Sequence, residues 1–529
     1  IFQATRSGTT VSSFTFGSST KVGVGGTTPT AAQLEVHGGA YNTSILIKGS
    51  GADTGIKFVD SGGTTDGYIK ATGGEIGFLD DDAEWAVKVD TDTSTSLLVN
   101  NSTKLLVDAN SSISLSNNDS GTSNTIFGKS AGASLDAGSN YNVFIGENVS
   151  DGSMDNATKN VGVGYDSLGA LTTADENVAI GYYALKSATT GSGNVSVGSN
   201  ALQNLTTGTD NIAIGESALE SAEAGETANI AIGEGAMYAM KEGTGGSARH
   251  IDYNIAIGVS ALNGADMEGD QNIYNNIAIG YRALYSVDGS GSYSQTGSIG
   301  IGTEALNALT SGQENIAVGS KALNDLTTGD DNTAIGFEAM DELVDGHRNT
   351  AVGASAMGNV VGGTTSDGSS DNVFIGYISG GGGWADAASS YNVAVGNYTL
   401  DAAMNTASYN TAVGHQSLSA IIGGVQNTAV GAKSGTALDG GGYNAIFGHE
   451  AGLALTDGHN NVAIGNRALS SSTSVGICVA IGDDAMQSGN MTSGADGTIA
   501  IGGSALANLT TGADNIAIGQ NALTGHTTG

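Results

Sequence analysis

The chain has 529 residues, including 85 Gly and a single proline, Pro29, and only 13% of its residues are charged. This composition excludes collagen, which needs Gly at every third position and abundant Pro, and a long coiled coil, which needs Glu, Lys and Leu in heptads. The formal net charge of −35 disfavours nucleic acid and anionic membrane surfaces as partners, because phosphate contacts need a basic face. The single cysteine, Cys478, excludes disulfide bonds within the chain, and no apolar run approaches the roughly 18 residues of a membrane-spanning helix.

Residues 1–120 have the pattern of short β-strands separated by turns of Gly, Ser, Asp and Asn. Strands are expected at residues 34–36, 44–47, 55–59, 75–79, 86–89 and 104–107. Each strand is too small to bury a core alone, which favours a β-rich shaft built by several chains. The acidic turn formed by Asp80, Asp81, Asp82 and Glu84 could hold Ca²⁺ through its hard oxygens. A solvated turn is the favoured interpretation, and no cofactor is assigned.

From about residue 121 onward, a short motif recurs: Asn, any residue, Ala, Ile and Gly, followed after two variable residues by Ala and Leu. It has 22 copies, counted by the last residue of the five, which we call the closing glycine. Of the 21 spacings between closing glycines, 11 are 17 residues and the others run from 18 to 25. This period is too short for helical-hairpin repeats of about 33 residues or more and fits one turn of a β-solenoid. We therefore expect a β-rich shaft or connector at 1–120 and a parallel β-solenoid at 121–529.

The repeat predicts which residues fill the core. The residue before the closing glycine is Ile, Val or Phe in all 22 copies, and the residue two before it is Ala, Gly or Ser in 18 copies. Neighbouring strand residues point to opposite faces, so the branched residue is expected to face the interior. The small residue would then lie on a second face, where close contact with another backbone explains its size. This interpretation predicts solenoids packed side by side in a multimer. Leu or Met, four residues after the closing glycine in 17 copies, is expected to fill the core from the next side.

Asn stands four residues before the closing glycine in 19 of the 22 copies, and the exceptions are Ser298, Cys478 and Thr498. In stacked coils these side chains would form a ladder in which each amide bonds to the next. A row of ligand-binding amides is the alternative, but a residue that occurs once per coil is usually structural. The expected ladder includes Asn177, Asn211, Asn315, Asn332 and Asn515.

The Asn-x-Ala-Ile-Gly repeat resembles the head repeats of trimeric autotransporter adhesins of the YadA type, which fold as left-handed parallel β-rolls packed in threes about one axis. With its Ala-Leu and Leu-Thr-Thr-Gly extension, as at residues 205–208 and 326–329, it is still more similar to repeats of bacteriophage tail-fibre proteins. The segment from Val22 through Pro29 to Val36 also resembles one that is common in phage tail fibres. The resemblance implies an all-β, homotrimeric fibre with a left-handed solenoid, whose coils of about 17 residues are longer than those of adhesin heads.

Several coils are enlarged, and the extra residues must leave the solenoid as loops. Spacings of 25, 22 and 22 residues follow one another between Gly233 and Gly302, and spacings of 23 and 20 lie between Gly353 and Gly396. Loops on a rigid scaffold are a common place for binding residues. The candidate receptor contacts in these loops are Lys241, Arg249, His250, Tyr253 and Trp384. Insertions that are tolerated without any ligand are the alternative.

These features predict a structural phage tail-fibre protein, extracellular and part of the virion. It would form homotrimers, contact other fibre or virion proteins, and attach to a host-surface glycan or protein. A bacterial trimeric adhesin or surface filament is the alternative, and a polysaccharide-degrading tailspike is the least favoured. The seven histidines are scattered and no nucleophile elbow or nucleotide loop is present, so no enzymatic activity is expected. The chain begins at Ile1 without a signal-peptide pattern and stops at Gly529, where another repeat would follow, so we expect it to be part of a longer product.

Overall fold

The computed structural model is all-β, with a single turn of 3-10 helix among the residues that it describes. These are residues 53–59, 65–72, 75–79, 85–90, 94–99, 102–108, 113–114, 123–240, 251–264, 272–286, 295–359, 368–384, 387–487, 491 and 493–528. The chain divides into two units, Ile1–Ser114 and Leu115–Gly529, where the sequence predicts a division between residues 120 and 121. The strands expected at 34–36 and 44–47, and the acidic turn at residues 80–84, lie outside the described residues.

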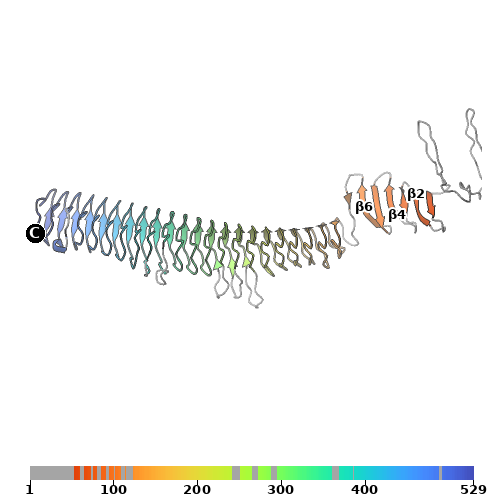
Figure 1. Cartoon of the computed structure of the whole chain (residues 1–529), viewed down its shortest axis with the longest axis horizontal. Helices are drawn as coiled ribbons and strands as arrows, with labels where there is room; N and C mark the ends of the chain where they lie inside the picture. The colour runs from red at the N-terminus through yellow and green to blue at the C-terminus, as the bar shows by residue number, and fades with distance from the viewer. Residues whose placement is uncertain are drawn as a thin grey trace, which may run out of the picture. The chain divides into compact units, whose positions relative to one another are not determined.

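In the first unit, seven strands form one antiparallel sheet in chain order (Figure 1). They are β1 (Asp53–Val59), β2 (Thr65–Thr72), β3 (Glu75–Leu79), β4 (Trp85–Asp90), β5 (Ser94–Val99), β6 (Ser102–Asp108) and β7 (Ile113–Ser114). Ile69 pairs with Ile56 on one side and with Phe78 on the other, so apolar residues share one face. The strands expected at 55–59, 75–79, 86–89 and 104–107 are confirmed. The sequence does not predict β2 and β5, because Ser, Thr and Gly interrupt their apolar alternation.

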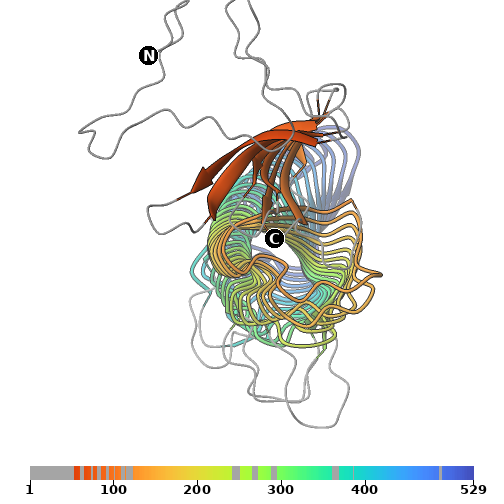
Figure 2. The same ribbon diagram turned by 90° about the vertical axis from the view of Figure 1, so that its right-hand side faces the viewer.

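In the second unit, the repeats form a parallel β-solenoid in which 22 three-residue strands are described, one from each copy of the motif (Figures 1 and 2). The first eleven are β8 (Thr125–Phe127), β9 (Val143–Ile145), β10 (Val161–Val163), β11 (Val178–Ile180), β12 (Val195–Val197), β13 (Ile212–Ile214), β14 (Ile230–Ile232), β16 (Ile255–Ile257), β18 (Ile277–Ile279), β20 (Ile299–Ile301) and β21 (Ile316–Val318). The second eleven are β22 (Thr333–Ile335), β23 (Thr350–Val352), β24 (Val373–Ile375), β25 (Val393–Val395), β26 (Thr411–Val413), β27 (Thr428–Val430), β28 (Ala445–Phe447), β29 (Val462–Ile464), β30 (Val479–Ile481), β31 (Ile499–Ile501) and β32 (Ile516–Ile518). Figure 2 looks along the solenoid and shows successive coils nearly superimposed.

Each of these strands from β8 to β31 pairs in parallel with the strand of the next coil, so equivalent residues of the repeat lie side by side. Ala213 of β13, for example, lies between Ser196 and Ala231. The enlarged coils add a second, three-stranded parallel sheet made of β15 (Ile251–Asp252), β17 (Ile273–Tyr274) and β19 (Gln295–Thr296). The 3-10 turn η1 (Ser493–Ala495) lies in another enlarged coil.

The closing glycine allows the coils to stack closely. Gly215 has a φ of +139°, and a Cβ atom there would lie 2.5 Å from the carbonyl oxygen of Gly233 in the next coil. Gly319 repeats this geometry, with a φ of +142° and a distance of 2.2 Å to the oxygen of Gly336. Any other residue would strain the backbone and clash with the neighbouring coil, so the stacking itself requires glycine.

The sequence-based assignment of the two strand faces is wrong, because the small residue faces the core and the branched residue faces outward. Ala213, Ala334 and Ala517 are buried, whereas the side chain of Ile214 is 38% exposed. The interior of each coil is narrow, and Leu219 fills it from the opposite side. Only a methyl-sized side chain then fits at the strand, so the row of small residues reflects the thickness of the core and not a contact with another chain.

Candidate functional site

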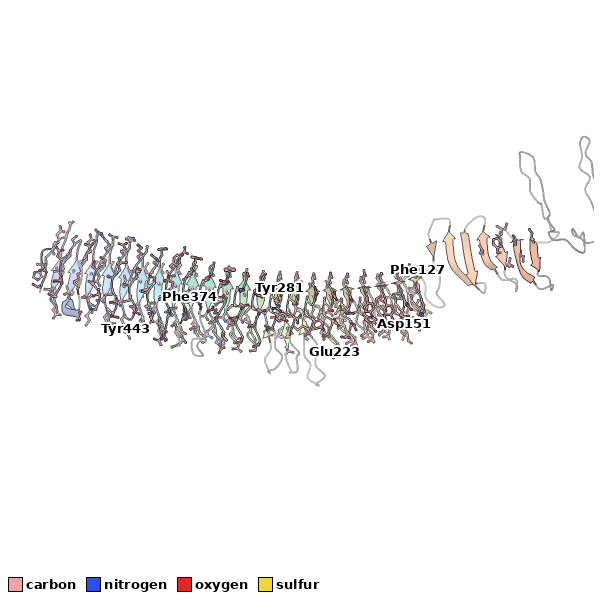
Figure 3. The ribbon with its side chains drawn as sticks, in the orientation of Figure 1. Phe127, Asp151, Glu223, Tyr281, Phe374 and Tyr443 are labelled. Atoms are coloured by element: carbon pink, nitrogen blue, oxygen red, sulfur yellow. The ribbon has the colours of Figure 1, made fainter. Side chains whose placement is uncertain are left out.

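One surface extends over all 22 described coils of the solenoid: the outward sheet face, which we define as the side chains one and three residues before each closing glycine. In β13 these are Ile212 and Ile214, and Phe127 in β8 is another member (Figure 3). Ile214 is 38% exposed and Ile335 is 41% exposed, because each packs against equivalent residues of the adjacent coils but has no cover above it. Neither position carries a charged residue in any of the 22 copies. An uncharged apolar strip of this length is typical of a protein interface.

The asparagines beside the strands form a buried ladder of hydrogen bonds. The Oδ1 atom of Asn194 accepts hydrogen bonds from the backbone N–H and from Nδ2 of Asn211, both at 3.0 Å. Nδ2 of Asn211 also donates to the carbonyl oxygen of Glu226 at 2.7 Å. The same pattern includes Asn177, Asn315 and Asn332. These side chains are buried and bonded within the chain, so their role is to join the coils and not to bind a ligand.

The ladder is interrupted where the repeat lacks Asn. Ser298 separates two runs, and its Oγ accepts a hydrogen bond from the backbone N–H of Asn315 at 3.3 Å. Cys478 is buried at a ladder position, and its Sγ lies 3.4 Å from the carbonyl oxygen of Ala495. The expectation that Asn515 belongs to the ladder is wrong. The preceding coil offers Thr498, which has no carboxamide oxygen, and Nδ2 of Asn515 bonds to the carbonyl oxygen of Gly512 in its own coil.

The enlarged coils between Gly233 and Gly302 place several polar and aromatic residues on the surface. Lys241, Arg249 and His250 lie outside the described residues. Tyr253 is described, directly after β15, and its side chain is 62% exposed. Of the candidate contacts in this region, Tyr253 therefore has the exposed position that the sequence predicts.

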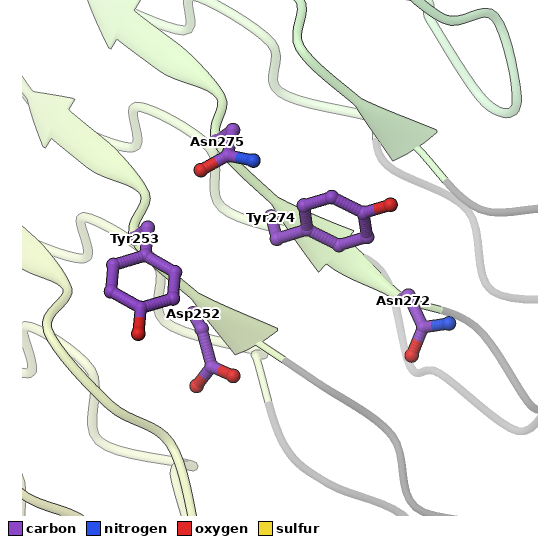
Figure 4. A pocket seen from close by; sticks show the side chains of 5 residues that line it. All are labelled: Asp252, Tyr253, Asn272, Tyr274 and Asn275. Atoms are coloured by element: carbon purple, nitrogen blue, oxygen red, sulfur yellow. The ribbon is translucent and has the colours of Figure 1, made fainter.

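Tyr253 belongs to a surface pocket of about 460 Å³ that Asp252, Asn272, Tyr274 and Asn275 also line (Figure 4). Strand alternation builds it, because inward-facing isoleucines anchor β15 and β17 and turn their neighbours outward. Asp252 lies opposite Tyr274 in the register of the two strands. The Oδ1 atom of Asp252 accepts a hydrogen bond from the backbone N–H of Thr227 at 2.8 Å, which orients the carboxylate. Sequence reasoning missed Asn272, Tyr274 and Asn275, although the pairs Ile251–Asp252 and Ile273–Tyr274 stand at the same distance before Asn254 and Asn276 and so signal two strands of the second sheet.

The expectation that Trp384 is a surface contact is wrong, because its side chain is only 1% exposed. Its ring packs edge-on against Phe374, with 5.6 Å between the ring centroids. Its Nε1 donates a hydrogen bond to the carbonyl oxygen of Gly380 at 2.9 Å. The insertion in this coil therefore brings an aromatic side chain into the core.

A second pocket, of about 270 Å³, contains a cluster of carboxylates on the surface of two neighbouring coils. Glu338, Asp341 and Glu342 line it, together with Ser355 and Asn359. Burial, with added repulsion from Glu338, Glu342 and Asp325, raises the pKa of the Asp341 carboxyl to about 7. Burial is also the main cause that raises the pKa of Glu342. The cluster therefore holds at least one proton at mildly acidic pH.

Within the described ranges, no group of three or more His, Cys, Asp or Glu side chains is arranged to hold a metal ion. Over the same part of the chain, none of the helices has the length and apolar character that crossing a membrane would need. A scan against models of protein families and searches of curated proteins and of solved structures found no match for this chain.

Proposed function

We propose that this chain is a subunit of an elongated homotrimeric fibre that attaches to a host surface, with no catalytic role of its own. The outward sheet face carries this proposal. It is mainly apolar, it extends over all 22 described coils, and none of its positions is charged in a chain with a net charge of −35. A face that met only water would carry Lys or Glu at many of these positions, whereas its polar side chains are five threonines, at residues 125, 333, 350, 411 and 428.

The area of this face fits a stable assembly. Parallel coils stack at about 4.8 Å, so 22 coils give a strip roughly 100 Å long, and strands of three residues make it about 10 Å wide. The resulting area of about 1,000 Å² per chain is similar to the roughly 800 Å² that each partner buries in a standard protein interface. It also exceeds the largest apolar patch of a typical monomer, about 300–600 Å².

Identical copies are the best occupants of this face, because a strip with one repeat per coil is matched by the same strip on another chain. Three such sheets facing a common axis would cover all three strips at once. This arrangement, with a left-handed solenoid and coils of about 17 residues, is the one that the resemblance to phage tail fibres and adhesin heads implies. The subunit contact in this proposal differs from the one expected from the sequence, since it uses Ile and Val and not the buried Ala.

The attachment role is proposed for the enlarged coils. Regular coils present nearly the same surface one after another, so they offer a target little that distinguishes one coil from the next. The region of β15, β17 and β19 differs from the regular coils, because it has an added sheet and a pocket. A host-surface glycan or protein would bind there, other fibre or virion proteins would bind elsewhere along the chain, and the assembly would function outside the cell as part of a virion.

Measuring the mass of the native assembly tests the fibre. Sedimentation equilibrium should give three times the chain mass of 52.3 kDa, and electron micrographs should show rods. A monomer at micromolar concentration would overturn the proposal. Release of reducing ends from host capsule would replace it with a degrading tailspike. Neighbouring genes for a tail or for a membrane-anchoring barrel would distinguish a phage fibre from a bacterial adhesin.

A further inference from the structure

We propose that the pocket lined by Tyr253 and Tyr274 binds an uncharged hexopyranose unit of a surface glycan. The inference deepens the attachment role given above and rests on it. The pocket volume of about 460 Å³ lies within the range of about 300–1,000 Å³ that is usual for small-ligand sites.

Two exposed tyrosine rings provide the apolar part of the site. Tyr253 is 62% exposed and Tyr274 is 37% exposed; Tyr274 lies in β17, and Tyr253 directly follows β15, the strand that pairs with β17 (Figure 4). A pyranose ring has one face made mainly of C–H groups, which packs on an aromatic ring while its hydroxyls point sideways. Tyrosine suits a contact that is partly exposed to solvent, because its ring is apolar and its hydroxyl can form a hydrogen bond with water or with the ligand.

The polar residues of the pocket match the hydroxyls of a sugar. Asn272 and Asn275 each carry a carboxamide with two N–H donors and an acceptor oxygen. Asp252 adds a carboxylate, which has about four lone-pair sites, and its bond to Thr227 fixes one oxygen in place. Neighbouring hydroxyls of a sugar are each donor and acceptor, so a mixture of amides and one carboxylate can bond to them in pairs.

The negative charge of the pocket and of the chain favours neutral glycans over acidic ones. Asp252 is the only Asp, Glu, Lys, Arg or His among the five described residues that line the pocket, and the chain as a whole carries a net charge of −35. A uronate or sialate carboxylate would therefore meet repulsion at short range from Asp252 and at longer range from the fibre. An apolar peptide is disfavoured because three of the five lining side chains are polar amides or a carboxylate.

The position of the pocket supports recognition and not only packing. The second sheet consists of β15, β17 and β19, and within the described residues these strands occur only in the enlarged coils. In the regular coils that the structure describes, no named strand lies at this place, and Ser408 and Val425 form one isolated bridge there. The pocket is therefore a local feature on an otherwise repetitive surface, which is what a specific attachment point needs.

The test measures binding of the intact assembly to soluble oligosaccharides of glucose, galactose and mannose, three to six units long, with oligogalacturonate as the charged probe. Calorimetry should detect binding to at least one neutral oligomer and weaker or no binding to oligogalacturonate. Tyr253→Ala and Tyr274→Ala should each weaken the binding about tenfold, while Tyr274→Phe, which keeps the ring, should retain most of it. Asp252→Asn keeps an acceptor oxygen for Thr227 and should allow oligogalacturonate to bind more tightly than it binds the unchanged protein.

Tyr443→Ala is the matched control. Tyr443 and Tyr253 both directly precede the Asn position of the repeat, have φ values of +61° and +59°, and are 58% and 62% exposed. Only Tyr253 lines the pocket. Loss of binding with Tyr253→Ala but not with Tyr443→Ala supports the site. Binding to none of the neutral oligomers, equal loss with both variants, or tighter binding of oligogalacturonate to the unchanged protein would overturn it. Since all these outcomes are measured on assemblies of known mass, they leave the fibre proposal to be judged separately.

Discussion

Phe374 occupies the space that a side chain at Gly380 would need. A Cβ atom at Gly380 would lie 2.5 Å from Cδ1 of Phe374. Phe374 stands two residues before the closing glycine Gly376, where most coils have Ala. Gly380 stands four residues after Gly376, where most coils have Leu or Met. The two positions therefore face each other across the core, and a large residue at one requires a small residue at the other.

Ile126 and Ile446, two other large residues at the strand position, also face a glycine. A Cβ atom at Gly132 would lie 3.1 Å from Cδ1 of Ile126, and one at Gly452 would lie 3.2 Å from Cδ1 of Ile446. Gly435 makes room in the same way for Ile446 of the next coil, also at 3.2 Å. In these coils the core is filled from the strand and not from the position four residues after the closing glycine.

This complementarity predicts the outcome of a double-mutant cycle at Ala213 and Leu219. Ala213→Ile alone should overpack the core and cost about 1–3 kcal/mol, and Leu219→Gly alone should leave a cavity and cost about 2–5 kcal/mol. The double variant copies the pair Ile446 and Gly452, so it should be more stable than the sum of the single effects by about 0.5–3 kcal/mol. Denaturant unfolding of the full chain measures this coupling. Additive effects would show that the two positions do not face each other.

The sequence predicts the solenoid well because its period is a direct consequence of stacking. A motif that returns in 22 copies leaves few architectures open, and the closing glycine marks a backbone contact that no other residue allows. The strand faces cannot be assigned in the same way, since Ala beside Ile is compatible with either residue pointing inward. Only the pairing of Phe374 with Gly380, or of Ile446 with Gly452, distinguishes the two choices, and this pattern is visible in the sequence once the exceptions are compared.

The binding surface is harder to predict because it depends on irregular coils. Tyr253 is exposed, as expected if the extra residues of enlarged coils leave the solenoid as loops. Trp384 lies in a similar insertion but is buried against Phe374. Chain length alone does not show whether an insertion folds outward or back into the core. Tyr274 is placed by its pairing with Asp252 in a sheet that the main repeat does not contain.

The asparagine ladder predicts a large difference between two chemically identical substitutions. Asn332→Ala should cost at least about 2 kcal/mol, because it removes the bonds to Asn315 and Gly346 and leaves Asn349 without its acceptor in a buried site. Asn515→Ala removes a bond to Gly512 at a half-buried position, so it should cost about 1 kcal/mol or less. Thermal unfolding of the two variants makes the comparison. Similar shifts in melting temperature would mean that the ladder adds little beyond a local turn.

The carboxylate cluster around Asp341 predicts that stability falls as the pH rises. The folded chain keeps the Asp341 proton up to a pKa of about 7, whereas the unfolded chain releases it near the ordinary value of 3.8. The folded state therefore binds more protons between these two values. The stability from this proton is complete below about pH 4 and is lost as the pH rises through about 7. Asp341→Asn should flatten this part of the melting curve against pH and raise the melting temperature at about pH 8.

Asp457→Asn is the control for the pH experiment, because Asp457 is an exposed carboxylate on a regular coil. It should leave the slope of melting temperature against pH unchanged between about pH 4 and pH 8. If Asp341→Asn gives the same pH profile as the unchanged protein, the repulsion among Glu338, Asp341 and Glu342 does not govern the stability of these coils.

The outward sheet face predicts how the assembly responds to charge. Replacing both Ile335 and Ile464 by Lys places two ammonium groups on this face, whose members are 41% and 39% exposed in a single chain. If the face is covered by other copies, each unpaired buried charge should cost about 3–5 kcal/mol, and the assembly should dissociate at concentrations where the unchanged protein stays associated. Sedimentation velocity over a range of concentrations measures this shift. The matched control replaces Ile422 and Ile477 by Lys. These two isoleucines are 41% and 68% exposed but lie outside the outward sheet face. The control should keep the mass of the native assembly. If both variants dissociate equally, the effect comes from general destabilisation of the coils and not from a subunit contact on this face.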